Sequence, residues 1–155
     1  MFATRMAMAA AALASVGCAS IVNDTTHPMK VETLTEQGTA VAGAECTMTN
    51  DYGSFTVKSG TTSPIRRSGQ DLDVVCKHPE NPDARARVIS RANAGLAGNI
   101  IFGGGIGAII DHSKGTAYTY PTWIQLVFGK ALVFDRSADK EDGQPTPATP
   151  PAETK

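Results

Sequence analysis

The stretch "AECTMTNDYGSFTVKS", residues 44–59, gives the strongest indication of the fold class. It begins with a strand-like run that carries Cys46 and continues into "NDYG" at residues 50–53, whose residue types favour a tight turn. After the turn, apolar residues alternate with polar ones at Phe55 and Val57. Such alternation places one face of a strand against a core. The stretch therefore predicts two strands joined by a turn.

Short runs of the same character recur on both sides, with glycine, serine or proline between them. A spacing of about ten residues is typical of a small β-sandwich or meander and not of a parallel βαβ protein. We therefore expect a mainly β, antiparallel sandwich or meander in one domain that spans residues 28–135. The further runs are "MKVETLT" (29–35), "SPIRRSG" (63–69), "DLDVVCKH" (71–78), "ARARVISR" (84–91) and a closing strand within "TAYTYPTWIQLVF" (116–128).

The N-terminal segment has the layout of a secretory signal. Arg5 precedes an uncharged apolar run from Met6 to Val16, and small residues follow. A membrane-spanning helix needs about 20 apolar residues, so this run is too short to be one. Residues 1–17 are therefore expected to be a signal peptide.

The end of this segment, "SVGC" at residues 15–18, resembles a bacterial lipobox, although Ser15 stands where leucine is usual. The resemblance implies that Cys18 is acylated and that residues 18–27 link it to the domain. Two or more acyl chains anchor a protein stably on a bilayer. Because Ala19 is not aspartate, we expect the outer membrane, with the protein facing the periplasm. Ordinary signal cleavage, which would leave a soluble periplasmic or secreted protein, is the alternative.

The chain has three cysteines, and an odd number leaves one without a disulfide partner in an exported protein. Assigning Cys18 to the lipid leaves one pair. We expect Cys46 and Cys76 to form a disulfide in an oxidising periplasm. Closing a loop of about 30 residues would stabilise the fold by about 3–4 kcal/mol in the chain-entropy model. The rival is a metal site that combines both cysteines with His78, but the paired spacing of zinc ligands is missing.

A glycine-rich insert, residues 94–111, contains "GNIIFGGGIGAII". Gly95, Gly103 and Gly107 lie at multiples of four residues from one another, so on a helix they would share one face and allow close approach of a backbone. We expect a helix or a broken helical hairpin that packs on the sheet, which makes the fold α+β overall. Each interior glycine costs about 1 kcal/mol, so packing must offset that cost.

Other interpretations of the insert remain open. A phosphate-binding loop would need a βαβ context, which the chain lacks. The apolar run is too short to cross a bilayer, yet shallow insertion beside the lipid anchor and self-association through the glycine stripe both fit the pattern.

The remaining residues argue against two function classes. The net charge is −1 and the basic residues are scattered without interleaved aromatics, so nucleic-acid binding is not expected. Asp111, His112, Ser113 and Lys114 have catalytic residue types, but they are sequential, whereas a catalytic set converges from separate elements. No catalytic residue, metal or cofactor is expected, and the protein is not expected to be an enzyme.

The C-terminal segment, residues 136–155, is rich in proline, alanine, threonine and charge and has no apolar periodicity. Such a segment buries too little surface to offset its ordering entropy. It is expected to be a disordered tail.

A family resemblance covers most of the mature chain. Residues 43–78 are similar to PEGA-type surface domains, which implies an Ig-like, non-catalytic β-fold outside the cytoplasm. More broadly, the chain resembles short proteobacterial envelope lipoproteins in which such a module precedes a "GN…GGxxG…D…G…YxYP" segment. The residues that match the PEGA pattern are Gly43, Ala44, Asn50, Gly53, Thr61, Pro64, Leu72 and Val74, and those that match the second segment are Gly98, Asn99, Gly103, Gly104, Gly105, Gly107, Asp111, Gly115, Tyr118, Tyr120 and Pro121.

Together these observations predict a lipid-anchored envelope lipoprotein that acts as a structural or interaction module in the periplasm. Its expected partners are the membrane, through the anchor, and an envelope protein or a second copy of the chain. The alternatives are a periplasmic ligand-binding or hydrolytic protein, and an oligomerising membrane-associated protein that uses the glycine stripe.

Overall fold

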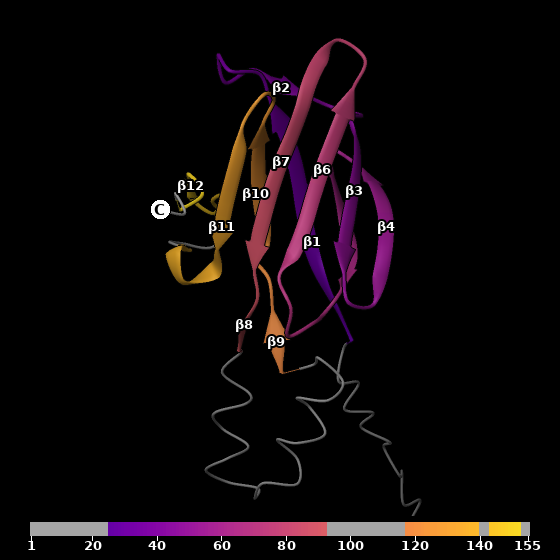
Figure 1. The fold of residues 1–155 in the computed structure, drawn as a ribbon, viewed down its shortest axis with the longest axis vertical. Coiled ribbons are helices and arrows are strands. Elements are labelled where there is room, and N and C mark those ends of the chain that lie inside the picture. Colours follow the sequence, from indigo (N-terminus) through magenta and orange to yellow (C-terminus); the bar gives the residue numbers. More distant parts are fainter. Residues whose placement is uncertain (1–24, 93–116, 140–142, 153–155) are drawn as a thin grey trace, which may run out of the picture.

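A computed structural model describes residues 25–92, 117–139 and 143–152 of the chain. Two β-sheets face each other across a shared core (Figure 1). The predicted signal peptide, Cys18 and the glycine-rich insert lie outside the described residues. Among the described residues, no helix is long and apolar enough to cross a bilayer.

The first sheet is built around the strand β1 (Thr26–Leu34). On one side, β1 pairs antiparallel with β5 (Thr61–Arg66) and, further along, with β2 (Ala40–Val41). On the other side it pairs parallel with β10 (Trp123–Val127).

The second sheet runs in the order β12-β11-β7-β6-β3-β4. A separate short pair, β8 and β9, lies beyond the lower end of the sandwich in Figure 1, and a short 3₁₀ helix, η1, follows β11. The bounds of these elements are β3 (Glu45–Asn50), β4 (Gly53–Lys58), β6 (Leu72–His78), β7 (Asn81–Ile89), β8 (Arg91–Ala92), β9 (Tyr118–Thr119), β11 (Ala131–Asp135), η1 (Arg136–Ala138) and β12 (Ala148–Thr149).

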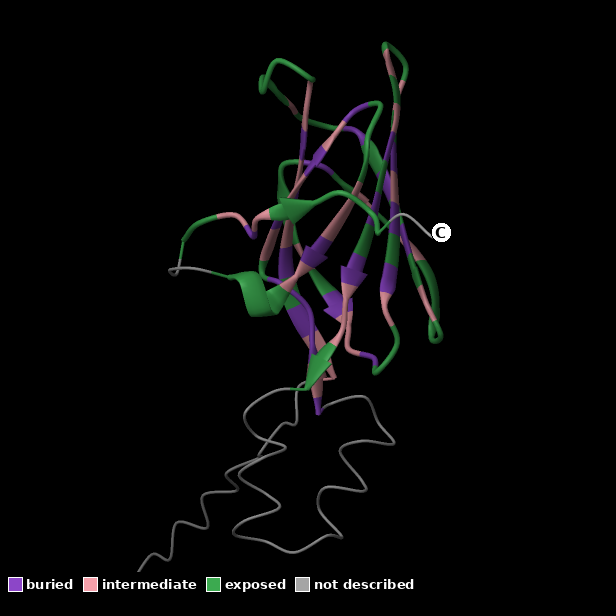
Figure 2. Ribbon diagram, turned by 60° about the vertical axis from the view of Figure 1, so that its left-hand side comes forward, coloured by how far each residue is buried: buried purple, intermediate pink, exposed green. Residues whose placement is uncertain are grey.

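The core forms because apolar residues alternate along the strands that face it. In β6, the buried Leu72, Val74 and Cys76 alternate with more exposed neighbours. Side chains two residues apart share one face of a strand, so this pattern turns one face of each sheet inward. Figure 2 shows that the buried segments lie mainly on the strands, whereas most of the loops and some short strands are exposed. The core joins both sheets through Met29, Val31, Ile65, Ile124 and Leu126 of the first and Met48, Val74, Val88 and Phe134 of the second.

Among the described residues, four connections run directly from one sheet to the other, namely β2–β3, β4–β5, β5–β6 and β10–β11, and two of these lie at the margins of the sandwich. Residues 59–60 join β4 to β5, and residues 128–130 join β10 to β11. Both are short, and each contains a glycine with positive φ, +88° at Gly60 and +80° at Gly129. Glycine tolerates this backbone conformation at low cost. The two connections therefore form corners at opposite margins of the sandwich.

The expectation of an antiparallel fold is wrong for two strand pairs. The pairs β1–β10 and β7–β11 are parallel, so the sheets are mixed. Parallel strands need a long connection between them, and here each partner lies far along the chain from the other. Pairing of that kind leaves no local signal in the sequence. The expectation of a mainly β fold is confirmed.

The expected α+β character is not supported, because the described residues contain strands and one 3₁₀ helix but no α-helix. The helix expected in the insert 94–111 falls outside those residues. The domain boundary also differs slightly: β1 begins at Thr26, inside the segment expected to be a linker.

The segment expected to be a disordered tail contains ordered residues. Residues 136–138 form η1, and β12 adds to the edge of the second sheet through the register Val133↔Thr149 and Phe134↔Ala148. Thr146, just before β12, is only 4% exposed. Pairing with a sheet edge satisfies the backbone N–H and C=O groups of this segment and needs no apolar periodicity. Composition alone therefore did not predict that the segment is ordered.

Candidate functional site

The described residues that border the glycine-rich insert meet at one end of the sandwich, which we call the lower end (residues 25–27, 66–71, 89–92 and 117–122). In the short pair β8–β9, Ala92 lies opposite Tyr118 and Arg91 lies opposite Thr119. The two borders of residues 93–116 therefore lie on two paired strands, at the bottom of Figure 1. The lower end is the candidate functional site because it holds both borders of the insert beside the start of β1.

His27 is the buried titratable group of this end. It lies on the inward face of β1 and is 6% exposed, and its Nδ1 lies 3.1 Å from the hydroxyl oxygen of Thr119. Burial, together with the positive charges of Arg67 and Arg136, lowers the pKa of His27 to about 4. The imidazole is therefore neutral at pH 7, and its Nε2 has no hydrogen-bond partner among the residues that the structure describes.

Tyr120 closes the lower end of the core. Its ring is fully buried, and its hydroxyl donates to the carbonyl of Gln70 at 2.8 Å. The side-chain amide of Asn50 donates to the Arg66 carbonyl at 3.0 Å and lies 3.4 Å from the Tyr120 hydroxyl. Burial raises the pKa of Tyr120, so the phenol stays protonated. These contacts join the β3–β4 turn to the connection between β5 and β6.

Arg67 links β1 to the re-entering strand. Its Nε donates to the Thr26 carbonyl at 2.9 Å, and one of its terminal nitrogens donates to the Tyr118 carbonyl at 3.2 Å. A guanidinium has several donors in a fixed plane, so one side chain can join two separate backbone segments. Arg67 therefore holds the start of β1 and β9 together.

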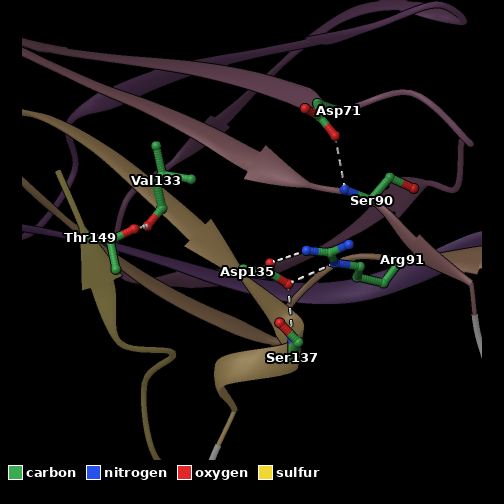
Figure 3. Close-up of polar contacts among 7 residues, drawn as sticks. All are labelled: Asp71, Ser90, Arg91, Val133, Asp135, Ser137 and Thr149. Atoms are coloured by element: carbon green, nitrogen blue, oxygen red, sulfur yellow. Dashed lines mark hydrogen bonds and ion pairs between the residues drawn. The ribbon is translucent and has the colours of Figure 1, made fainter. Parts of the chain in front are cut away.

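A second polar group joins the β5–β6 connection to the end of β7. The hydroxyl of Ser90 donates to the Ser68 carbonyl at 2.5 Å, and its backbone N–H donates to Asp71 at 3.1 Å (Figure 3). The Ser68 hydroxyl in turn donates to the carboxylate of Asp51. These bonds position the residue that immediately precedes β8.

Arg91 of β8 forms a bidentate ion pair with Asp135 at the end of β11 (Figure 3). Its Nε lies 2.9 Å from one carboxylate oxygen, which also accepts the N–H of Ser137 at 2.9 Å. These contacts, above all the hydrogen bond from Arg91, hold the pKa of Asp135 well below its usual range. The pair is partly exposed, so its contribution to stability is small, but its planar geometry orients β8.

The chemistry available at this end is that of a rigid support. His27 and Thr119 have the residue types of a base and a hydroxyl nucleophile, but they are 6% and 1% exposed. A nucleophile must reach a substrate, whereas the His27 imidazole and the Thr119 hydroxyl are buried. In the described ranges, no three His, Cys, Asp or Glu side chains are placed to hold a metal ion.

Two grooves lie on the described surface, and His27 lines neither of them. The larger, of about 690 Å³, crosses the outer face of the second sheet. The smaller lies between Tyr52 and Arg66, whose guanidinium carbon is 4.6 Å from the ring centre. Residues that line the larger groove include Asp73, Val75, Arg85, Arg87, Val133 and Pro151.

The structure brings together one predicted pair of site residues. Cys46 and Cys76 lie directly opposite each other on β3 and β6, with their sulfur atoms 2.03 Å apart as in a disulfide bond. Bonded to each other, they are not available as thiolate ligands for the rival metal site. His78 lies at the far end of β6, at the opposite end of the sandwich from Ala92 and Ala117.

The other predicted residues lie outside the described residues. They are Cys18, the glycine stripe of Gly95, Gly103 and Gly107, and the polar turn of Asp111, His112, Ser113 and Lys114.

Sequence reasoning missed the polar contacts of the lower end. One available signal was the alternation through Met29 and Val31, which places His27 on the same inward face when it is continued two residues back. The partners of His27 had no such signal, because Thr119 is 92 residues away in the chain.

Comparison with known proteins gives no match among protein-family models, curated proteins or solved structures.

Proposed function

We propose that the chain is a lipid-anchored cell-envelope protein that acts as a non-catalytic interaction module in the periplasm. In this proposal Cys18 carries the acyl chains, and the domain faces the periplasm from the outer membrane. The PEGA-type resemblance, with its implied non-catalytic β-module, is part of the proposal.

The observation that carries the proposal is the position of the chain ends at the domain boundary. β1 begins at Thr26, and Ala92 and Ala117, which border the insert, lie at the same lower end. A chain spans at most about 3.3–3.6 Å per residue. The segment from Cys18 to Thr25 would therefore hold the lower end within about 25 Å of an anchored sulfur.

This geometry supports a role for the glycine-rich insert next to the bilayer. An anchor at Cys18 would turn the lower end toward the membrane, and with it the segment that leaves at Ala92 and returns at Ala117. The contacts of Arg67 and Arg91 would keep that segment's two borders in place. The domain would then present the insert to the bilayer surface or to a membrane-proximal partner.

The first experiment tests the anchor. The wild-type protein is expected in detergent-extracted membranes, with an acylated Cys18 detected by mass spectrometry, whereas Cys18→Ser should move to the soluble periplasmic fraction. A Cys46→Ala, Cys76→Ala double variant is the control for cysteine loss in general and should stay in the membrane. An unchanged distribution of Cys18→Ser would refute lipidation.

The second experiment tests the orientation. A photo-crosslinking amino acid is placed at Phe102 in the insert or at Thr39, an exposed residue in the turn at the upper end. Lipid adducts are expected at position 102 and not at position 39, and only while Cys18 is intact. Equal labelling at the two positions would contradict an insert held beside the bilayer.

The glycine stripe belongs to the same proposal. We infer that residues 94–111 form the helix or helical hairpin and that Gly95, Gly103 and Gly107 are its contact surface. Gly103→Leu is expected to lower the melting temperature or change the oligomeric state, while Ile106→Leu, which conserves volume, should do neither. Identical melting temperature and assembly for both variants would reject a close-packing role.

A further inference from the structure

The edge of β11 is only partly covered by the chain's own C-terminal segment. One side of β11 pairs with β7 from Ala131 to Asp135. The other side pairs with β12 at two register positions only, Val133↔Thr149 and Phe134↔Ala148. The ladder between β11 and β12 does not continue over the rest of β11.

Thr146 pins this segment to the sandwich. It is 4% exposed, its N–H donates to the Trp123 carbonyl at 2.8 Å, and its hydroxyl donates to Asp139 at 2.5 Å. Thr149 adds a hydrogen bond from its hydroxyl to the Val133 carbonyl at 3.3 Å (Figure 3). The segment is thus attached at few points, and segments with few buried contacts open at low cost.

The prolines of the segment prevent it from continuing the sheet. Proline has no N–H to donate, and natural proteins use it to protect sheet edges from further pairing. Ala148 and Thr149 are the β12 residues that retain an N–H, and they are flanked by Pro147 and Pro150. The segment therefore covers the β11 edge and does not create a new one.

Without the segment, β11 would present the sequence "ALVFD", apolar except for Asp135, along an unpaired edge. β12 already shows that this edge accepts an antiparallel strand. A second copy of β11, related by a two-fold axis at Val133, would meet that requirement with the same surface on both partners.

The carboxylate of Asp135 does not oppose this pairing. In a pair centred on Val133, Asp135 of one copy lies opposite Ala131 of the other. The two Asp135 residues are then four positions apart along the strand, about 14 Å at 3.4 Å per residue. That exceeds the screening length of about 8 Å at physiological salt. Each Asp135 is also neutralised by its own Arg91.

We propose that residues 143–152 are a removable cap, and that release of the cap turns the edge of β11 into a self-association surface for a second copy of this chain. The two second sheets then join through β11 into one continuous sheet. This inference is independent of the lipid anchor and of the glycine-rich insert.

The test compares the full chain with a chain that ends at Asp139, both as Cys18→Ser variants. Light scattering after size exclusion measures the mass of each. The shortened chain is expected to have twice the assembly mass of the full chain. Unchanged mass in a shortened chain that keeps its β circular dichroism signal would overturn the proposal.

A proline placed at the edge tests the surface itself. The Val133 carbonyl faces β12, and in a strand the N–H of the same residue points to the same side. Val133→Pro thus removes an edge donor without removing a bond to β7. In the shortened chain it should restore the mass of the full chain, and a doubled mass that survives this change would overturn the proposal.

A full-length variant covers the case in which the shortened chain does not fold. Thr146→Asp places a carboxylate beside Asp139 and should expel the cap, so a doubled mass is expected. Thr56→Asp, on the exposed side of β4, is the matched control and should leave the mass unchanged. Equal masses for the two aspartate variants, with the amides of residues 131–135 exchanging faster only in Thr146→Asp, would overturn the proposal.

Discussion

The two margins of the sandwich are closed in different ways. At the stapled margin (β3, β4, β5 and β6), a disulfide joins neighbouring strands and the corner at residues 59–60 is bonded into the core. At the capped margin (β10, β11 and β12), the corner at residues 128–130 is followed by an edge that residues 143–152 cover.

Ser59 shows what the stapled margin has and the capped margin lacks. It is 2% exposed, and its hydroxyl accepts the N–H of Ala44 at 3.0 Å and donates to the Val41 carbonyl at 3.1 Å. The Thr33 hydroxyl lies 3.0 Å away. A buried polar cluster whose members are all bonded makes a corner rigid. At the capped margin, the corner at residues 128–130 is bonded through its backbone, but the edge of β11 beyond it is covered by a separate segment that Thr146 attaches, so we expect that edge to open first.

The largest effect is expected from removing the staple. The Cys46→Ala, Cys76→Ala double variant should lose about 3–4 kcal/mol of unfolding free energy, because the bridge closes a long loop in the unfolded chain. Denaturant unfolding measures this loss. Amide exchange in β3 and β6 should then become as fast as exchange in β11, and unchanged protection in β3 would show that the staple does not set the difference between the margins.

Acid should lower the free energy of unfolding through His27 at the lower end. The pKa of His27 is about 4 in the folded protein, against 6.5 ordinarily, so the unfolded chain binds more protons in this window. The contribution of neutral His27 to stability is therefore fully present above pH 6.5 and is lost as pH drops toward 4 and below, by at most about 3.4 kcal/mol. Unfolding free energy measured across this range checks the slope.

Two variants separate His27 from other titrating groups. His27→Gln should remove the dependence between pH 6.5 and 4, whereas His78→Gln, at the other end of the sandwich, should keep it. The lowered pKa of Asp135 acts in a different window, because its contribution is lost only as pH falls below 3.8. An unaltered slope in His27→Gln would assign the acid sensitivity elsewhere.

A smaller effect is expected at the corner of the stapled margin. Ser59→Ala leaves the buried N–H of Ala44 without its partner, which should cost about 1–3 kcal/mol. Thermal unfolding measures the change. Ser54→Ala, an exposed position on β4, is the matched control and should stay within about 0.5 kcal/mol of the wild type.

The smallest effect is expected from Thr146→Val at the capped margin. It removes the hydroxyl bond to Asp139 but keeps the backbone bond to Trp123, so global stability should fall by about 1 kcal/mol. Amide exchange should accelerate in β11 and β12 and not in β3 or β4. Acceleration throughout the sandwich would mean that the two margins unfold as one unit.

Parts of the fold followed from local patterns alone. Alternation in β4 and β6 and the turn at residues 50–53 predicted strands where the structure has them. Cys46 and Cys76 were expected as a pair from counting, and the register of β3 and β6 places them opposite each other. These features depend on neighbours a few residues apart.

Other parts had no local signal. The strand at residues 131–135 was not anticipated, nor was the addition of β12, whose prolines favoured a disordered interpretation. At the candidate site, the residue types of His27, Arg67 and Tyr120 carry no indication of their partners, which lie on distant segments. Contacts of that range are set by how strands pair, and pairing depends on the whole sheet.

Local patterns in the sequence were enough to predict short strands with one apolar face and the pairing of Cys46 with Cys76. Alternation of side chains is a property of the extended backbone, so it survives in any arrangement of the strands. The tertiary structure decided which strands run parallel, where the two corners lie, and which edge is covered by residues 143–152. Those features arise because burying two faces against each other and satisfying backbone groups at the edges are requirements of the whole domain.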